Sequence, residues 1–554
     1  MSKRAALLAA LRRYPELAAL DVRTTLPAEP VTGYRLRAKL VAAGRALGLY
    51  ARGSHDVVDL PRCALLHPRL ARAADGVRRA LPFAFTLHGV DLRVVDDGVL
   101  LTLLVDAGVD EAEVRAAAER LRAAQPEIVG VALSRRAPGS PQLLGAAPQT
   151  ISGADSAPHR LAPDAPFHTA APGSFVQAHA GQAARLYAAL ERELADALGT
   201  LRDQPVLELY AGSGALALAL SRAGARVTAV DSFEPGVRRL EAAARAQGLA
   251  LAAVAARAEQ ALTAELAPRA VVVDPPRRGL SPEVRAAIAR LGPELVAVVS
   301  CSPATLARDL SHLARLGYHG DAVTPIDMIP YSDSVEAFVV LRRGESAAPA
   351  LIYEDDALIV IDKPPFLSTT PQGEHPSSLL DGVRQLPGAE RAVPVHRLDI
   401  GTSGVCLFAR EPGRVEALSA ALARSEKQYL ALVRGVVRER GNIRRPLREG
   451  AKQRPALTRY RRERVAGTHS LVRARPEQGR QHQIRRHFAS IGHPVLGDAR
   501  YGDPASNRYF EEQHGLDRSF LHLTRLELAL DAGPLLLQAE LAPDLAAVLS
   551  SLTR

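Results

Sequence analysis

The chain has 554 residues, more than one hydrophobic core normally serves, so at least two domains are expected. Hydrophobic residues make up 47% and charged residues 23%, as in ordinary folded proteins. Lys and Arg (70) outnumber Asp and Glu (60), and the net charge of +10 favours a polyanionic partner such as nucleic acid, although a bias toward alanine and arginine explains the same excess.

Cysteine usage and the length of apolar runs exclude several classes of protein. The three cysteines, Cys63, Cys301 and Cys406, are too few and too far apart for a disulfide framework or a four-thiolate metal site. No apolar run approaches the ~20 residues that span a bilayer. Residues 2–20 carry charges where a signal peptide needs a neutral core. We therefore expect a monomeric cytoplasmic protein with no membrane partner.

Residues 1–165 are predicted to form an α+β region that binds RNA or substrate. Apolar and basic residues alternate from Tyr34 to Leu40, so a strand here has one apolar and one cationic face. An ordinary solvated strand face gives the same pattern. Residues 138–166 are rich in Pro, Gly, Ser and Ala and are predicted to be a loop or linker.

Residues 166–343 are predicted to form a Rossmann-like catalytic domain, because short β-branched runs alternate with helical patterns. A glycine turn from Tyr210 to Gly214 follows one of these runs, and Asp231 closes the next, an arrangement that suits a nucleotide-like cofactor. A generic Rossmann turn or a dinucleotide-dependent oxidoreductase has the same features.

Two segments farther along favour a different chemistry. Asp274 ends an apolar run, and the two prolines after it present its carboxylate at the sheet edge where ligands bind. Cys301 ends the following run and precedes a predicted helix, a setting in which a thiolate forms readily. Hydride transfer needs no thiolate, whereas methylation of a pyrimidine at C5 does, because addition at C6 makes C5 nucleophilic. Glu336 is the candidate base for the C5 proton.

These elements resemble the S-adenosylmethionine-dependent RNA 5-methyluridine methyltransferases over roughly residues 30–343. The matching segments are 175–177, the Tyr210 turn, 274–277, 300–309 and 325–336. The resemblance implies that Cys301 is the nucleophile and Glu336 the proton acceptor. It also implies that S-adenosylmethionine contacts a set of four residues: Gln177, Tyr210, Asp231 and Asp274.

The chain departs from that family at three positions. Ser302 stands where the family usually has Asn after the catalytic cysteine, and His179 and Ala215 replace two further Asn residues. Some members hold an iron–sulfur cluster on four cysteines. This chain keeps only Cys63 of these, so we predict no cluster.

A second pattern begins after a predicted linker at 344–350 and fills residues 351–554. Asp399 lies in the segment His396 to Gly404, where it either starts an ordinary glycine-containing turn or forms a functional site. A carboxylate at a strand end is costly to bury without a cation, and the segment 479–487 supplies one. A facing arginine is expected to keep Asp399 ionised, and therefore able to act as a nucleophile or base.

These segments resemble the RluA-type pseudouridine synthases, which have a mixed sheet. The matching blocks are 396–404, 427–435, 479–485, 492–502 and 521–522. The resemblance implies that Asp399 attacks the ribose or removes a proton from it, so that uracil detaches, rotates and rejoins through C5. Tyr429 would stack on the base and Arg485 would pair with Asp399, with no cofactor. The basic insert 444–464, which includes Tyr460, suits phosphate contact and stacking, or is a solvated charge run.

The favoured interpretation is a multidomain α/β and α+β enzyme that modifies uridines in RNA by both chemistries, with rRNA as the first expected substrate and tRNA as the second. The alternative is an active pseudouridine synthase whose methyltransferase-like half serves only as an RNA-binding platform. An oxidoreductase with an RNA module is a more distant alternative.

Overall fold

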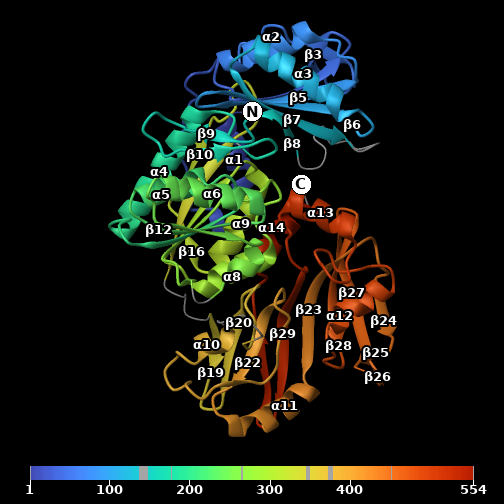
Figure 1. Ribbon diagram of the computed structural model, residues 1–554. Coiled ribbons are helices and arrows are strands. Elements are labelled where there is room, and N and C mark those ends of the chain that lie inside the picture. Colours follow the sequence, from blue (N-terminus) through green and yellow to red (C-terminus); the bar gives the residue numbers. More distant parts are fainter. Residues whose placement is uncertain are drawn as a thin grey trace.

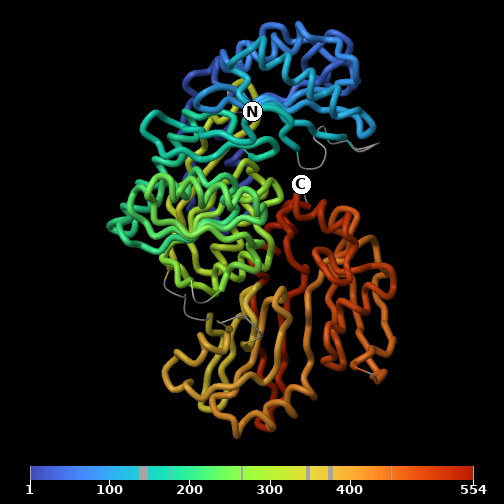
Figure 2. The backbone as a smooth tube through the Cα atoms, viewed as in Figure 1, coloured from blue at the N-terminus to red at the C-terminus, as the bar shows by residue number. Residues whose placement is uncertain are grey.

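The structure is a computed structural model that describes residues 2–136, 148–175, 177–263, 266–344, 350–371, 378–450 and 452–552. Figure 1 shows three successive parts, coloured blue to cyan, green to yellow, and orange to red along the chain. The tube in Figure 2 shows that the C-terminal part contacts the middle part along one side. Each part is built on its own main sheet, which agrees with the predicted multidomain α/β and α+β fold.

The first part is a mixed sheet in the order β4-β3-β2-β5-β6-β7-β8, with helices α2 and α3 packed on it. The predicted alternation from Tyr34 to Leu40 is present, since Leu36, Ala38 and Leu40 are buried while Lys39 is exposed. Arg37 on the polar face pairs with the buried Asp91 (3.0 Å). The elements are β2 (Arg37–Ala43), β3 (Ala46–Tyr50), β4 (Val57–Asp59), α2 (Pro68–Ala80), β5 (Leu87–Val95), β6 (Gly98–Asp106), α3 (Glu111–Ala124), β7 (Ile128–Arg136) and β8 (Gln149–Gly153).

The middle part is a doubly wound sheet in the order β1-β17-β18-β15-β14-β11-β12-β13, with β16 beside β18. Strands β13, β12, β11, β14 and β15 run parallel, and their carboxyl ends therefore share one edge. The strands are β1 (Asp21–Val22), β11 (Pro205–Leu209), β12 (Arg226–Asp231), β13 (Leu251–Ala255), β14 (Ala270–Val273), β15 (Leu295–Ser300), β16 (Tyr318–His319), β17 (Ala322–Ile326) and β18 (Glu336–Arg343).

Helices cover both faces of this sheet, and two apolar clusters fill the two interfaces. They are α1 (Lys3–Leu11), η1 (Pro15–Leu17), α4 (Ala180–Leu198), α5 (Ala215–Arg222), α6 (Glu234–Ala246), α7 (Ala258–Ala261), α8 (Pro282–Leu291) and α9 (Pro303–Arg315). The hairpin of β9 (Ala157–His159) and β10 (His168–Ala170) lies between the first and middle parts. Because β1 pairs with β17, the predicted region 1–165 is divided between the first two sheets.

The C-terminal part is a mixed sheet in the order β19-β20-β22-β29-β23-β28-β27-β24, as the resemblance implied. Its elements are β19 (Leu351–Glu354), β20 (Leu358–Lys363), α10 (Leu379–Val383), β21 (Val393–Pro394), β22 (Ser403–Ala409), η3 (Pro412–Arg414), α11 (Val415–Arg424), β23 (Glu426–Val433), β24 (Arg440–Arg444), β25 (Leu447–Glu449), β26 (Lys452–Arg454), β27 (Leu457–Ala466), β28 (His469–Pro476), α12 (Gln483–Ser490), α13 (Pro504–His514), β29 (Leu521–Leu530), β30 (Gly533–Gln538) and α14 (Pro543–Ser551).

The predicted linker at 344–350 lies mostly outside the described residues, because only Gly344 and Ala350 are described there. The domain boundaries therefore stay predictions. Across the described ranges, no helix has the length and apolar character needed to cross a membrane.

Candidate active sites

The glycine turn of the middle sheet connects β11 to α5. Tyr210 begins it in the left-handed region (φ 64°), and Gly214 (φ 76°) precedes the first turn of α5. A Cβ on Gly214 would lie 2.1 Å from Cδ1 of Leu240, so only glycine lets α5 pack here. The backbone N–H of Gly212 donates to the Asp231 carboxylate (2.9 Å), which joins the turn to the end of β12.

Carboxylates gather beside this turn. Burial raises the pKa of Asp274 to about 6, and burial together with the charges of Asp274 and Asp231 raises the pKa of Glu208. One carboxylate oxygen of Glu208 is buried without a hydrogen-bond partner among the described residues. A glycine turn beside these carboxylates fits S-adenosylmethionine, which brings hydroxyl donors and positive charge.

Strand pairing brings Cys301 and Glu336 together at the same edge. Ser300 of β15 pairs with Ala337 of the antiparallel β18, so the residue after Ser300 faces the residue before Ala337. Glu336 is 8% exposed, and burial followed by the charge of Asp274 raises its pKa to about 8. The thiol and the carboxyl group are 35 positions apart in the sequence, and they lie side by side because β15 and β18 are paired.

The electrostatics of Cys301 differ from the sequence prediction. The N-terminus of α9 was expected to favour the thiolate, but burial and the charge of Glu336 raise the pKa of Cys301. Arg277 opposes this shift, because its guanidinium hydrogen-bonds the sulfur. Burial and the carboxylates therefore act against the readily formed thiolate that the sequence predicts.

The other predicted cofactor contacts lie around this edge. Gln177 hydrogen-bonds Tyr187 of α4, a side chain whose pKa is raised by burial and by Asp274, Glu208 and Glu336. Tyr210 is half-buried at the start of the glycine turn, and burial raises its pKa to about 12.

Two of the three residues that depart from the methyltransferase family pattern cap a helix. His179 accepts a hydrogen bond from the backbone N–H of Gln182 (3.3 Å) at the start of α4. Its ring stacks on Tyr34 of the first part (4.7 Å between centroids). Ser302 caps α9 by accepting from Thr305 (3.5 Å). Each of the two side chains thus satisfies a backbone N–H at a helix start, and Ala215 begins α5.

The second site surrounds Asp399 in a cavity of about 1060 Å³. Nη1 of Arg485 lies 2.8 Å from Oδ2 of Asp399, and Nε2 of His482 lies 3.6 Å from Oδ1. The predicted pairing of Asp399 with Arg485 is present in the geometry. The Asp399 side chain is 30% exposed, so it is open to a substrate.

Arg485 is held by a second carboxylate, Asp498. Its Nε and Nη2 atoms bond the two oxygens of Asp498 at 2.7 and 2.8 Å, and Asp498 is fully buried. This fork fixes the guanidinium and leaves Nη1 for Asp399. Sequence reasoning missed the role of Asp498, although it lies in the matching block 492–502.

The turn after Asp399 is held through its backbone carbonyls. The buried ammonium of Lys363 donates to the carbonyls of Thr402 (2.9 Å) and Pro364 (2.8 Å), and burial lowers its pKa to about 7. Tyr429 of β23 lines the same cavity, and burial together with the charge of Asp399 raises its pKa. The sequence analysis gave no role to Lys363 or to Arg277, although Arg277 ends the matching segment 274–277 and Lys363 follows an apolar run at the start of the second pattern.

The remaining cysteines pack in apolar surroundings. Cys406 is buried in β22 and Cys63 packs against the core of the first part. Within the described ranges no three His, Cys, Asp or Glu side chains are placed to hold a metal ion.

Comparisons with known proteins match a different enzyme family to each half of the chain. The family model described as tRNA (Uracil-5-)-methyltransferase matches residues 85–344, and that described as RNA pseudouridylate synthase matches residues 357–490. An uncharacterized RNA methyltransferase of Gloeobacter violaceus is 31% identical over 57% of this chain and 73% of its own length. Ribosomal large subunit pseudouridine synthase D of Xanthomonas campestris is 33% identical over 42% of this chain and 80% of its own length.

A solved structure shares the fold of the first two parts. The tRNA (uracil-54, C5)-methyltransferase of Pyrococcus abyssi, in complex with S-adenosyl-L-homocysteine, aligns with a TM-score of 0.50 and 21% identity, over 61% of this chain and 81% of its own. The chain therefore belongs to the tRNA (uracil-5-)-methyltransferase family through residues 85–344 and to the RNA pseudouridylate synthase family through residues 357–490.

Proposed function

We propose that this chain methylates uridine at C5 with Cys301 and Glu336 and converts uridine to pseudouridine with Asp399. The observation that carries the proposal is that each nucleophile lies beside the partner its reaction needs. Cys301 faces Glu336 across paired strands, and Asp399 faces Arg485 in an open cavity.

In the first reaction the sulfur of Cys301 forms a bond to C6 of the uracil, which makes C5 nucleophilic. S-adenosylmethionine supplies the methyl group. Glu336 then takes the C5 proton, the C5–C6 double bond forms again, and the thiolate leaves. The Tyr210 turn, Asp231, Asp274 and Gln177 are the proposed cofactor contacts. Arg277 favours the thiolate against the surrounding carboxylates.

In the second reaction Asp399 attacks the ribose or removes a proton from it, so that the bond from C1′ to N1 breaks. The free uracil rotates and rejoins C1′ through C5, and the C5 proton is lost. Arg485 and His482 hold the carboxylate, and Tyr429 stacks on the base. Both reactions need a uridine flipped out of its stack.

A groove outside the Asp399 cavity supports an RNA substrate. It measures about 880 Å³ and lies on the sheet face opposite α12, because most of its residues alternate along β23, β27 and β28 with Tyr429, Thr458 and Ala474; Tyr460 also lines it. Its basic side chains are Arg440, Arg459, Arg461, Arg473, Arg475 and Arg525. Such a row of guanidinium groups suits a phosphate backbone.

We propose rRNA as the first substrate and tRNA as the second. The relative from Xanthomonas is named for the ribosomal large subunit, whereas the matching methyltransferase family is named for tRNA. When both target uridines lie close together in one RNA, binding at one site raises the effective concentration of RNA at the other, because the two sites are on one chain.

The test uses the full chain with transcripts of large-subunit rRNA and of tRNA, with labelled S-adenosylmethionine for methylation and nucleoside chromatography for pseudouridine. Cys301→Ala should lose methylation and keep pseudouridine formation, and Asp399→Ala should do the reverse. Pseudouridine formation without any methyl incorporation by the unaltered chain would favour the platform alternative. Loss of both activities in either variant would contradict independent sites.

A further inference from the structure

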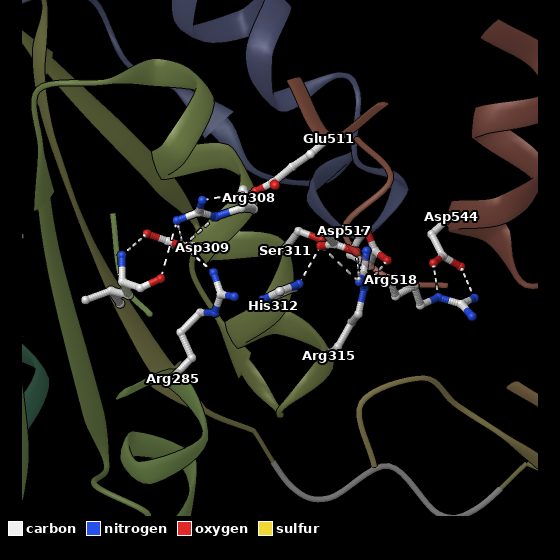
Figure 3. Close-up of polar contacts among 12 residues, drawn as sticks. Arg285, Arg308, Asp309, Ser311, His312, Arg315, Glu511, Asp517, Arg518 and Asp544 are labelled. Atoms are coloured by element: carbon white, nitrogen blue, oxygen red, sulfur yellow. Dashed lines mark hydrogen bonds and ion pairs between the residues drawn. The ribbon is translucent and has the colours of Figure 1, made fainter. Parts of the chain in front are cut away.

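Helix α9 extends from the methyltransferase site to the C-terminal part. It begins two residues after Cys301, and its last turn carries His312 and Arg315. Figure 3 shows both side chains directed away from the middle sheet toward Asp517, which precedes β29 of the C-terminal part. Among the described residues, the partners of these two side chains are Glu16, Asp517 and Phe366, none of which belongs to the proposed methyltransferase site, so their placement calls for another explanation.

Asp517 is a buried carboxylate whose partners both come from α9. Its side chain is 3% exposed, its Oδ2 contacts Nε2 of His312, and its Oδ1 lies 3.3 Å from Nη1 of Arg315. Arg315 is fixed in turn by Glu16 of η1, whose Oε1 accepts from Nε (2.6 Å). A buried charge that loses its partners is strongly destabilising, so the position of Asp517 depends on α9.

Phe366 forms the second contact between α9 and the Asp399 site. Its ring centroid lies 4.5 Å from that of His312, and the guanidinium carbon of Arg315 lies 5.1 Å from the same ring. Phe366 adopts a left-handed backbone (φ 63°), lines the Asp399 cavity, and donates its N–H to the carbonyl of Ile400 (2.7 Å). Ile400 directly follows Asp399.

Arg518 continues the path from Asp517. Its Nη1 donates to the carbonyl of Gly401 (2.9 Å), and its other nitrogens bond both oxygens of Asp544 at 2.6 and 2.9 Å. The carbonyls of Ile400 and Gly401 are thus held by Phe366 and by the residue next to Asp517. The turn that carries Asp399 is therefore supported by residues that rest on α9.

We propose that α9 of the methyltransferase domain is part of the pseudouridine synthase site, and that His312 and Arg315 are positioning residues for Asp399. The inference rests on the proposed pseudouridine synthase activity. His312 and Arg315 act through Asp517 and Phe366 and do not touch the substrate. A displacement of about 1 Å at a catalytic group can cost about a hundredfold in rate, so a small shift of this turn is measurable.

The experiment compares His312→Ala and Arg315→Gln with the unaltered full chain, on a large-subunit rRNA transcript made with uridine tritiated at C5. Without S-adenosylmethionine, tritium release reports pseudouridine formation alone. Both variants should lower kcat by about tenfold or more while KM stays within about threefold, because the carboxylate is displaced and the RNA-binding surface is kept. Arg315→Lys should restore part of kcat, since it keeps the charge but not the planar contact with Phe366.

Glu511→Gln is the matched control. It removes the ion pair of Glu511 with Arg308 (3.0 Å), which lies in the same interface, as Figure 3 shows. Within the described residues, the other hydrogen bonds of the Arg308 side chain go to Arg278, Leu280 and Asp309 and not to the Asp399 turn. This variant should keep kcat. Methylation and the thermal unfolding midpoint, measured by circular dichroism, are recorded for every variant.

Unchanged kcat in both α9 variants, or an equal loss in Glu511→Gln, would overturn the inference. A fall in kcat that accompanies loss of the folded state and of methylation would overturn it as well, because the interface would then support only the fold. An unaltered chain that forms no pseudouridine would instead overturn the proposed function.

Discussion

The thiol of Cys301 lies beside carboxylates and one guanidinium, whereas the carboxylate of Asp399 lies beside a guanidinium and an imidazole. The first environment raises the pKa of the thiol, whereas in the second the Arg485 guanidinium binds the carboxylate directly. The proposed methylation uses Glu336 without its proton and Cys301 as thiolate, and both groups have raised pKa values. The two reactions of this chain should therefore respond differently to pH and to single substitutions.

Methylation should accelerate as the pH rises through about 8. Burial and Asp274 raise the pKa of Glu336 to about 8, so the form that accepts the C5 proton is a minority at pH 7 and the majority at pH 9. Rates of methyl incorporation between pH 6 and pH 9 measure this, with pseudouridine formation as the internal control. A methylation rate that is flat across this range would contradict the role of Glu336.

Replacement Glu336→Gln should separate the two halves of the methylation reaction. Without the base, the C5 proton stays and Cys301 cannot leave C6, so a covalent complex between protein and RNA should accumulate. A band of reduced mobility on a denaturing gel, dependent on S-adenosylmethionine and absent in Cys301→Ala, is the expected result. Normal turnover in Glu336→Gln would assign the base to another residue.

Arg485→Lys should lower pseudouridine formation by roughly a hundredfold, because one ammonium cannot form the fork to Asp498 and still reach Asp399. The neighbouring Arg486→Lys is the control, since Arg486 is half-buried and donates to the carbonyl of Arg448 (3.2 Å). Steady-state kinetics on the same transcript compare the two. Equal activities would show that the fork has no part in the reaction.

At the scale of elements, strands β27 and β28 have two different faces. Thr458 and Ala474 are buried on the face toward α12, and the arginines between and beside them face the groove. Several of these arginines pair with glutamates at the rim, such as Arg459 with Glu477 (2.6 Å), whereas Arg440 has no ion pair within the described part of the chain. Because successive side chains of a strand point to opposite faces, the basic insert contributes to the core on one face and to the proposed RNA-binding groove on the other.

Substitution of Arg440 or Arg459 by Ala should weaken RNA binding about equally for all sequences. Each loss of a phosphate contact should reduce the slope of log Kd against log salt by about 0.7 to 0.9. Arg424→Ala is the control, because Arg424 is exposed on α11 and does not line the groove. Filter binding between about 50 and 200 mM salt measures the slope. Slopes that match the unaltered chain would remove the groove from the RNA-binding surface.

At the scale of the whole molecule, the interface along α9 joins two enzymes that are encoded far apart in the chain. Figure 3 shows Arg308 directed to Glu511 on one side and His312 and Arg315 directed to Asp517 on the other. Burial alone raises the pKa of Asp517, but the charges of His312 and Arg315 outweigh burial and hold it well below its usual range. The ionised carboxylate therefore contributes to stability.

This contribution should be lost in acid. The folded pKa of Asp517 is depressed, so its stabilisation is fully present above the unfolded value of about 3.9 and declines as the pH falls below it, by about 1.4 kcal/mol for each pH unit. Asp517→Asn should be less stable at pH 7 and should lose less stability between pH 4 and pH 3 than the unaltered chain. Urea unfolding followed by circular dichroism measures both. Parallel pH dependences would contradict the role of this carboxylate.

Much of the chemistry could be predicted from local motifs. The prediction of two enzyme families is confirmed, because each nucleophile lies in a short segment whose residue order is distinctive, such as His396 to Gly404. The doubly wound sheet is confirmed as well, since its β-branched runs are short and regularly spaced. The roles of Gln177, Tyr210, Asp231, Asp274, Cys301, Glu336, Asp399, Tyr429 and Arg485 stay predictions.

Sequence alone determined which chemical groups the chain carries and in which local setting each stands, because turns, strand ends and helix starts depend on near neighbours. Only the tertiary structure decided which of these groups are buried together and lie close enough to shift one another's pKa values. Burial and the Glu336 carboxylate that β18 brings beside it raise the pKa of Cys301, and Asp498 supports Arg485 because the chain after α12 folds back onto that helix. The contact of α9 with Asp517 joins residues some 200 positions apart, which no local pattern encodes. Burial and charge act through space, and proximity in space follows from packing of the whole chain.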